Sequence, residues 1–205
     1  KTPAIDRLAS EGMSFMDAHS TSGVCSPTRY GLLTGRYNWR SRLKRGIVGK
    51  WERPLIADAR LTLPEMFRAQ GYATCMIGKW HLGWHWPKKG GGVTQKLDEI
   101  DFTKPIKGGP NSHGFDTYYG DDVPNWPPYV WRENESLLGN PTVQMKQGTM
   151  VGVSAGPAVP DWDFSAVLLE YGKRCAEYVR GRKGKEQPFF LYFPMPSPHT
   201  PIAPG

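Results

Sequence analysis

The sequence predicts an α/β fold built around a largely parallel sheet. Helical and strand-like segments alternate, with one helix expected before an apolar strand at 72–77 and another before an apolar strand at 188–194. This alternation favours parallel pairing, because each helical crossover returns the chain to the same end of the sheet. The 205 residues are enough for one or two domains, and 39% hydrophobic with 22% charged residues is typical of a globular protein.

The first part of the chain contains two expected helices with a strand between them. Thr2 can cap a helix that begins with proline, and Gly12 can end it. Residues 13–19 alternate loosely between apolar and polar side chains and are predicted to form a strand. After a small, polar loop, a short helix is predicted over residues 27–33 and is closed by Gly35.

The next segments carry clear local signals. Residues 62–65 read Thr-Leu-Pro-Glu, a capping box that predicts a helix up to Gly71, and the strand at 72–77 follows at once. Residues 84–160 are rich in Gly, Pro, Asn and Trp and are predicted to be mostly irregular. A segment of this length inside a compact domain indicates either a substrate-recognition insertion or packed Ω-loops.

The last part of the chain returns to regular structure. Residues 165–180 carry apolar side chains at helical spacing. Residues 188–194 form a continuous apolar run, which predicts a strand buried on both faces. The proline-rich loop that follows places His199 at the carboxyl end of this strand, where ligands gather in open α/β sheets.

Composition limits the functional classes. No stretch approaches the roughly 18 apolar residues of a membrane helix. Three cysteines cannot form a disulfide framework, and we expect Cys75 and Cys175 to be small buried hydrophobic residues. The net charge is +7, and much of it lies between residues 36 and 53, which indicates either a polyanionic partner or a solvated loop. Nucleic acid is disfavoured, because the basic residues do not interleave with a recognisable nucleic-acid motif.

The segment from Cys25 to Arg36 combines a thiol with features that bind anions. It reads Cys-Ser-Pro-Thr-Arg-Tyr-Gly-Leu-Leu-Thr-Gly-Arg. Cys25 is expected at the start of a helix, where backbone N–H groups and the helix dipole favour negative charge. Arg29, four residues later, can turn its guanidinium toward the same point. This geometry suits a group that becomes an anion or holds one, and a low-pKa thiol nucleophile would satisfy it.

These residues resemble the signature of the sulfatases, Cys-x-Pro-x-Arg continued by Leu-Leu-Thr-Gly-Arg. Gly-Lys-Trp-His at 78–81 and the strand that ends in a Pro-His turn at His199 resemble further family motifs, in the family's order. Thr-Pro-Ala-Ile-Asp at 2–6 and His-Gly-Phe-Asp at 113–116 are also similar. The resemblance implies an alkaline-phosphatase-like three-layer α/β sandwich, of which residues 1–205 are the N-terminal part of the catalytic domain.

The resemblance also implies a mechanism. Cys25 is expected to be oxidised to formylglycine, whose hydrated aldehyde attacks the sulfur of a sulfate ester. Arg29 would hold the formylglycine hydroxyls. Lys79 and His81 would bind the diol and the sulfate, and His199 would donate a proton to the leaving oxygen or bind the sulfate. Calcium would coordinate the nucleophile oxygen of residue 25 and the sulfate oxygens.

The family's carboxylate ligands for calcium have no counterpart in this sequence. Cys25, as formylglycine, is therefore the one metal ligand expected here, and the carboxylates are expected outside the chain. Asp121-Asp122 is not assigned to metal, because it follows His-Gly-Phe-Asp in the expected substrate-side insertion. We expect the chain to be partial or a degenerate member. The sequence shows no signal peptide, and export to the periplasm, exterior or lysosome is a family expectation.

The insertion at 84–160 is expected to set specificity. Its candidate substrate-binding residues are Asp121, Asn125, Trp126 and Tyr129. Their aromatic rings could stack on a sugar, and their polar groups could form hydrogen bonds with its hydroxyls. A packed Trp/Pro loop without a binding role is an equal alternative. With the basic stretch, a sulfated carbohydrate is the expected substrate. Two alternatives stay open: a phosphonate or phosphate ester hydrolase of the same superfamily, and an inactive domain that binds sulfated polysaccharide.

Overall fold

The computed structural model describes residues 2–203. Its α-helices are α1 (Pro3–Glu11), α2 (Cys25–Thr34), α3 (Leu63–Ala69) and α4 (Ala166–Gly181). The strands of the central sheet are β1 (Ala73–Ile77), β4 (Thr117–Gly120), β5 (Arg132–Glu133), β6 (Ser136–Leu137) and β9 (Phe189–Tyr192). The connections hold the strand pairs β2 (Trp86–Pro87) with β3 (Val93–Thr94) and β7 (Val143–Met145) with β8 (Gly156–Ala158), and the 3-10 helices η1 (Asn38–Arg40), η2 (Leu97–Glu99) and η3 (Pro110–His113).

The central sheet has the strand order β6-β5-β4-β1-β9. β1 lies in the middle and pairs in parallel with both β4 and β9. β5 and β6 continue the sheet as an antiparallel extension beyond β4. The predicted α/β fold with a largely parallel sheet is therefore confirmed.

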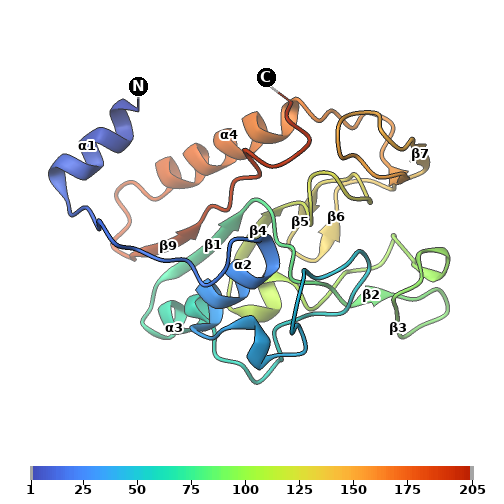
Figure 1. Ribbon diagram of the computed structural model, residues 1–205, viewed down its shortest axis with the longest axis horizontal. Helices are drawn as coiled ribbons and strands as arrows, with labels where there is room; N and C mark the ends of the chain where they lie inside the picture. Colours follow the sequence, from blue (N-terminus) through green and yellow to red (C-terminus); the bar gives the residue numbers. More distant parts are fainter. Residues whose placement is uncertain (1, 204–205) are drawn as a thin grey trace.

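Helices cover the two faces of this sheet (Figure 1), with α4 on one face and α2 and α3 on the other. Residues of β1 alternate between the faces, because successive strand side chains point in opposite directions. Cys75 packs in one cluster with Tyr171 of α4, whereas Met76 packs in another with Tyr30 of α2. The sheet therefore separates two apolar layers, as in a three-layer sandwich.

Two of the helix ends follow the predicted chemistry. The capping box of α3 is present: the Thr62 backbone N–H donates to Glu65 Oε2 (2.8 Å), and the Thr62 hydroxyl accepts from the Glu65 N–H (3.4 Å). α2 ends at Gly35 in the left-handed conformation, but it begins at Cys25, two residues before the predicted start. The predicted cap of α1 is wrong, because the Thr2 hydroxyl donates to the Asp6 carboxylate and leaves the backbone uncapped.

The strand predicted at residues 13–19 is wrong. No strand is assigned there, and every residue from 12 to 20 is exposed. Alternation stabilises a strand only where one of its faces can be buried. α1 itself is present where it was predicted, but it buries none of its residues.

The strand predicted at residues 188–194 exists as β9, but it is not buried on both faces. β9 forms one edge of the sheet, and Phe189 is 37% exposed. Its remaining residues are half-buried. An uninterrupted apolar run does not distinguish a central strand from an edge strand, so the sequence could not reveal this position.

The segment 84–160 has long irregular stretches, but it also contains three strands of the central sheet, β4, β5 and β6. β4 has four residues and ends in Gly120, so its pattern is too short to stand out in a loop-rich segment. The end of β4 places Asp121 and Asp122 at the same sheet edge as the residues after β1.

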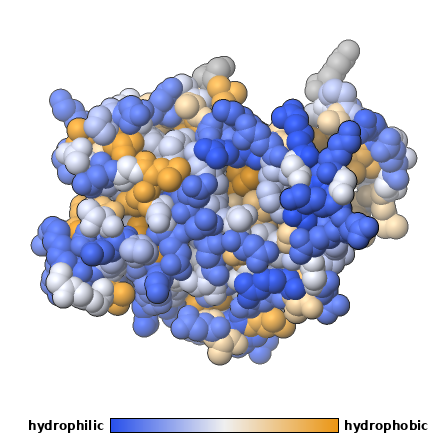
Figure 2. Space-filling view, turned by 180° about the vertical axis from the view of Figure 1, so that it is seen from behind, coloured by the Kyte–Doolittle hydropathy of each residue, from blue (hydrophilic) through white to orange (hydrophobic). Residues whose placement is uncertain are grey.

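The face opposite to that of Figure 1 is mainly hydrophilic, with separate hydrophobic patches (Figure 2). No helix within residues 2–203 has the length and apolar character required to cross a membrane.

Candidate active site

The candidate site lies where the carboxyl ends of β1 and β4 meet the first turn of α2. Residues 78–81 follow β1, and Asp121-Asp122 follows β4. Because β1 and β4 are parallel neighbours, both connections leave the sheet at one edge. Cys25 is the first residue of α2 and lies beside them.

Close backbone contacts fix the turn after β1. Gly78 has φ of +129°, and a Cβ atom on it would lie 2.6 Å from the Pro194 carbonyl oxygen after β9. The Lys79 backbone N–H donates to that same oxygen (3.2 Å), and the Trp80 N–H donates to the Asp121 carbonyl (3.1 Å). Glycine is therefore required at Gly78, and the ends of three strands hold the Lys79 backbone in place.

Lys79 is the charged residue that contacts Cys25. Its Nζ lies 3.6 Å from Cys25 Sγ, and the Lys79 side chain is buried whereas Cys25 is half-buried. Arg29 Nη1 donates to the Lys79 carbonyl at 2.6 Å. Burial lowers the pKa of Lys79, and the nearby Arg29 lowers it further, while the negative form of Cys25 acts in the opposite direction.

His81 is held in a single orientation. It has a φ of +55°, which is uncommon for a residue with a side chain, and its backbone N–H donates to Asp122 Oδ1 at 3.0 Å. Its Nε2 lies 3.0 Å from the Val48 carbonyl oxygen. Burial lowers the pKa of His81 to about 4, although the Asp122 charge opposes this effect. The imidazole is therefore neutral at pH 7.

The hydrogen-bond partner of His81 fixes its tautomer. A carbonyl oxygen can only accept, so Nε2 carries the proton and donates it to Val48. Nδ1 is then a bare acceptor. It is buried and has no hydrogen-bond partner within the part of the chain that the structure covers. His81 thus presents a lone pair that a hydroxyl can use.

Asp121, a predicted substrate-binding residue, lies in the interior and is 3% exposed. Burial raises its pKa to about 6, while Tyr171, Arg132 and Lys79 oppose the shift. Both carboxylate oxygens lack a hydrogen-bond partner among residues 2–203. The structure therefore places Asp121 beside Lys79 inside the protein rather than on a sugar-binding surface.

The other predicted substrate-binding residues separate into two groups. Trp126 is half-buried, and its ring meets His81 edge-on with centroids 5.1 Å apart. Tyr129 is 1% exposed, and its hydroxyl accepts from the Ser154 N–H (3.1 Å). Asn125 donates from Nδ2 to the Gly152 carbonyl (2.8 Å). Trp126 therefore belongs to the site, whereas Asn125 and Tyr129 hold the loop together.

His199 is not joined to this group. It is exposed, and its Nδ1 lies 2.7 Å from the Thr200 carbonyl oxygen. It lines a separate pocket of about 150 Å³ with Pro124 and Phe164. Within the described residues, no hydrogen bond connects His199 to Cys25 or Lys79.

Two further residues contact the site, although the sequence did not assign either of them a role there. Asp122 holds the His81 backbone, and Lys50 lies with Nζ 5.6 Å from the centre of the Trp126 ring. Asp122 could have been found if β4 had been recognised, since it lies just beyond the strand. Lys50 belongs to the basic stretch, but a charge count alone does not show which lysine reaches the site.

The residues around Cys25 do not form a calcium site by themselves. No group of three or more His, Cys, Asp or Glu side chains that could hold a metal occurs within residues 2–203. The charged group in contact with Cys25 is Lys79, and Arg29 contacts the Lys79 carbonyl, so these cations suit an anion.

Comparisons with known proteins agree with this geometry. The sulfatase family model matches residues 1–204. The chain is 31% identical to an N-acetylgalactosamine-6-O-sulfatase of Bacteroides thetaiotaomicron, covering 99% of this chain and 44% of that protein. It is 29% identical to arylsulfatase G of Mus musculus, covering 98% of this chain and 37% of that protein. The chain therefore spans less than half the length of these relatives.

The fold is shared with a solved structure from work on the metabolism of multiple glycosaminoglycans by Bacteroides thetaiotaomicron. The TM-score is 0.77 at 28% identity, covering 99% of this chain and 47% of that chain. This likeness confirms the predicted alkaline-phosphatase-like α/β fold. With a family match along nearly its whole length and the signature residues gathered at one sheet edge, this chain belongs to the sulfatase family.

Proposed function

We propose that this chain carries the nucleophile side of a sulfatase active site and that the protein removes sulfate from a sulfated carbohydrate. The observation that carries the proposal is the contact of Lys79 Nζ with Cys25 Sγ at 3.6 Å, at the start of α2. In this proposal Cys25 is converted to formylglycine, which supplies an aldehyde hydrate as the nucleophile. Calcium is implied by the family resemblance and would need carboxylate ligands in addition to these residues.

The cations at the site provide the electrostatic part of catalysis. Lys79 stabilises negative charge at residue 25 and on the sulfate, and its buried position strengthens this effect. Arg29 fixes the Lys79 backbone through its carbonyl and adds a second positive charge. A sulfate ester is an anion before and after the reaction, so two cations at one point also favour its binding.

His81 provides the complementary acceptor. Its neutral imidazole has a free Nδ1 lone pair, which would accept a hydrogen bond from a hydroxyl of the bound substrate or of the hydrated nucleophile. From the residue type alone His81 could also donate to the sulfate, but its hydrogen bond to the Val48 carbonyl favours the acceptor role for Nδ1. His199 stays a prediction as the donor to the leaving oxygen, tested by sulfate release from His199→Ala.

Substrate class is proposed from the relatives and from Trp126. The Bacteroides thetaiotaomicron relative is named for a sulfate at the 6-position of N-acetylgalactosamine. A sugar ring can stack on the half-buried Trp126 beside His81. Oligosaccharides that carry 6-sulfated N-acetylgalactosamine are therefore the first substrates to assay.

The mass of the peptide that carries Cys25, from protein made in its native host, tests the proposal. Replacement of the thiol by an aldehyde is expected at Cys25, with Cys75 unmodified as the internal control. Sulfate release should exceed phosphate release from matched esters. An unmodified Cys25 together with binding but no turnover would instead favour an inactive binder, and a preference for phosphate would favour a phosphoester hydrolase.

A further inference from the structure

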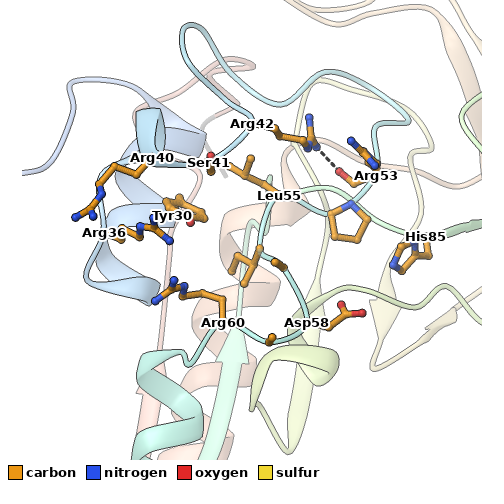
Figure 3. Close-up of a pocket in the computed structure, with 14 residues that line it drawn as sticks. Tyr30, Arg36, Arg40, Ser41, Arg42, Arg53, Leu55, Asp58, Arg60 and His85 are labelled. Atoms are coloured by element: carbon orange, nitrogen blue, oxygen red, sulfur yellow. Dashed lines mark hydrogen bonds between the residues drawn. The ribbon is translucent and has the colours of Figure 1, made fainter.

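A pocket lined by several arginines lies toward the C-terminal end of α2 (Figure 3). It has a volume of about 540 Å³. Tyr30, Leu55 and Ile56, all buried, contribute apolar lining. The arginines that line the pocket are Arg36, Arg40, Arg42, Arg53 and Arg60.

Most of these arginine charges are not compensated. Arg42 pairs with Glu52 at 2.8 Å, but the other four form no salt bridge within residues 2–203. Figure 3 shows Arg36, Arg40 and Arg60 on one side of the pocket and Arg42 and Arg53 on the other. Asp58 is the one acidic residue in the lining. Guanidinium groups match the planar, bidentate geometry of oxyanions, so the side with Arg36 and Arg60 suits an oxyanion.

The pocket is separate from Cys25. α2 has 10 residues, with Cys25 first, and Arg36 lies just past its last residue, Thr34. A helix of this length spans about 15 Å. A single sulfated monosaccharide bound at Cys25 therefore does not reach the arginines, so the pocket is not part of the catalytic group.

Two exposed aromatic residues lie between two of these arginines in the sequence. Tyr37 and Trp39 stack with ring centroids 4.1 Å apart, and they are 47% and 49% exposed. They stand between Arg36 and Arg40. Neither ring lines the pocket itself, so they add an exposed aromatic surface next to its arginines in the chain, where a ring of a longer ligand could pack.

We propose that this pocket binds a sulfate or carboxylate group of an acidic glycan, at a site distinct from Cys25. The glycan class rests on the proposed function, whereas the anion-binding character rests on the arginines alone. The Asp58 carboxylate, which also lines the pocket, can accept hydrogen bonds from sugar hydroxyls. Single-stranded nucleic acid uses a similar combination of cations and aromatic rings and is the competing ligand.

The test measures binding of a fluorescently labelled chondroitin sulfate decasaccharide by anisotropy at fixed ionic strength. All proteins carry Cys25→Ser, so that the probe is not hydrolysed. The pocket variant is Arg36→Gln with Arg60→Gln. Its matched control is Arg45→Gln with Arg68→Gln, two exposed arginines outside the pocket that give the same change in net charge. Thermal unfolding of both variants verifies that each is folded.

We expect the pocket variant to bind the decasaccharide at least about tenfold more weakly, because charged hydrogen bonds of this kind each contribute about tenfold in affinity. The control should change affinity by less than about twofold, since exposed charges are screened. Equal losses in both variants would overturn the proposal by showing non-specific attraction. Displacement of the decasaccharide by an equal charge of single-stranded DNA at the same concentration would overturn the glycan assignment.

The outcome is separable from the proposed function. An unmodified Cys25 would remove the catalytic proposal but leave a pocket-specific loss of binding standing. Conversely, formylglycine and sulfate release with no pocket-specific loss would retain the catalytic proposal and remove this one.

Discussion

At the scale of single residues, the site is defined by buried ionisable groups whose pKa values are shifted by burial. The pKa of Lys79 is lowered and that of Asp121 is raised to about 6, in both cases mainly by loss of solvent. The pKa of His81 is lowered to about 4 by the same cause. Perturbed groups that gather at one sheet edge are typical of functional sites, because a structural role alone rarely justifies their desolvation cost.

Replacement of Lys79 tests its proposed electrostatic role. Lys79→Met keeps the approximate side-chain length and removes the charge next to Cys25. Sulfate-ester turnover is expected to fall by about 100-fold or more, as it does when a preorganised charge-stabilising group is lost. The free energy of unfolding at pH 7 should not fall, because burial already disfavours this charge.

The matched control for that change is Lys173→Met, on the exposed surface of α4. It should keep wild-type kcat/KM. If the Lys79→Met variant turned over sulfate esters as fast as the Lys173→Met variant, Lys79 would have no role in the mechanism.

The raised pKa of Asp121 predicts how the stability of the protein depends on pH. In the native state its carboxyl keeps a proton up to a pH of about 6, because burial raises its pKa, whereas in the unfolded chain it loses the proton near pH 4. The native state therefore binds more protons between these values, and its stability falls as the pH rises through this window. The shift corresponds to about 3 kcal/mol when Asp121 is fully ionised.

Asp121→Asn stays neutral and should avoid this loss. Urea unfolding is expected to show similar stability of variant and wild type at pH 4, and a variant more stable by about 2–3 kcal/mol at pH 7. Asp98→Asn, an exposed aspartate, controls for the removal of a carboxylate. A variant that is less stable than wild type at pH 7 would show that the ionised carboxylate has a stabilising partner.

At the scale of secondary-structure elements, the turn after β1 transmits the sheet geometry to the site. Gly78→Ala would force a Cβ to within 2.6 Å of the Pro194 carbonyl oxygen, at a φ of +129°. A loss of about 2 kcal/mol or more in the free energy of unfolding is expected, because neither backbone can move freely. Chemical unfolding of Gly78→Ala against wild type measures this loss.

Gly172→Ala in α4 is the control for that substitution. A Cβ there meets no atom within 4 Å, and alanine is favoured over glycine in a helix. It should stabilise the protein by about 0.5–1 kcal/mol. Equal effects of the two substitutions would mean that the close approach to Pro194 relaxes at little cost.

The elements that the sequence predicted correctly are those with local chemical signals. The capping box of α3 and Gly35 at the end of α2 act within a few residues, so they can be read from sequence. β4 and the edge position of β9 depend on strand order, which short apolar runs do not encode. The false strand at 13–19 had a suitable pattern but no surface to cover it.

At the scale of the whole molecule, the site joins distant parts of the sequence. Cys25 and Lys79 are 54 residues apart, and the His81 backbone contacts Asp122, 41 residues later. Motif resemblance predicted that Cys25, Arg29, Lys79 and His81 would act together, and contacts link Cys25 and Arg29 to Lys79. It could not predict that Tyr129 is buried or that His199 lies apart, because both follow from how the irregular loops pack.

For the whole molecule, we expect the N-terminal segment to contribute much less to the stability of the fold than the sheet and the helices packed on it. α1 lies away from the sheet (Figure 1), and residues 2–20 bury nothing. Deletion of residues 2–18 is therefore expected to change Tm by less than about 2 °C, since few apolar contacts are lost. Met76→Ala, at a fully buried position in β1, should instead cost about 2–5 kcal/mol. Hydrogen exchange of backbone amides should be fast in α1 and slow in β1. If the deletion lowered Tm as much as Met76→Ala does, residues 2–18 would have to pack on the rest of the protein in solution.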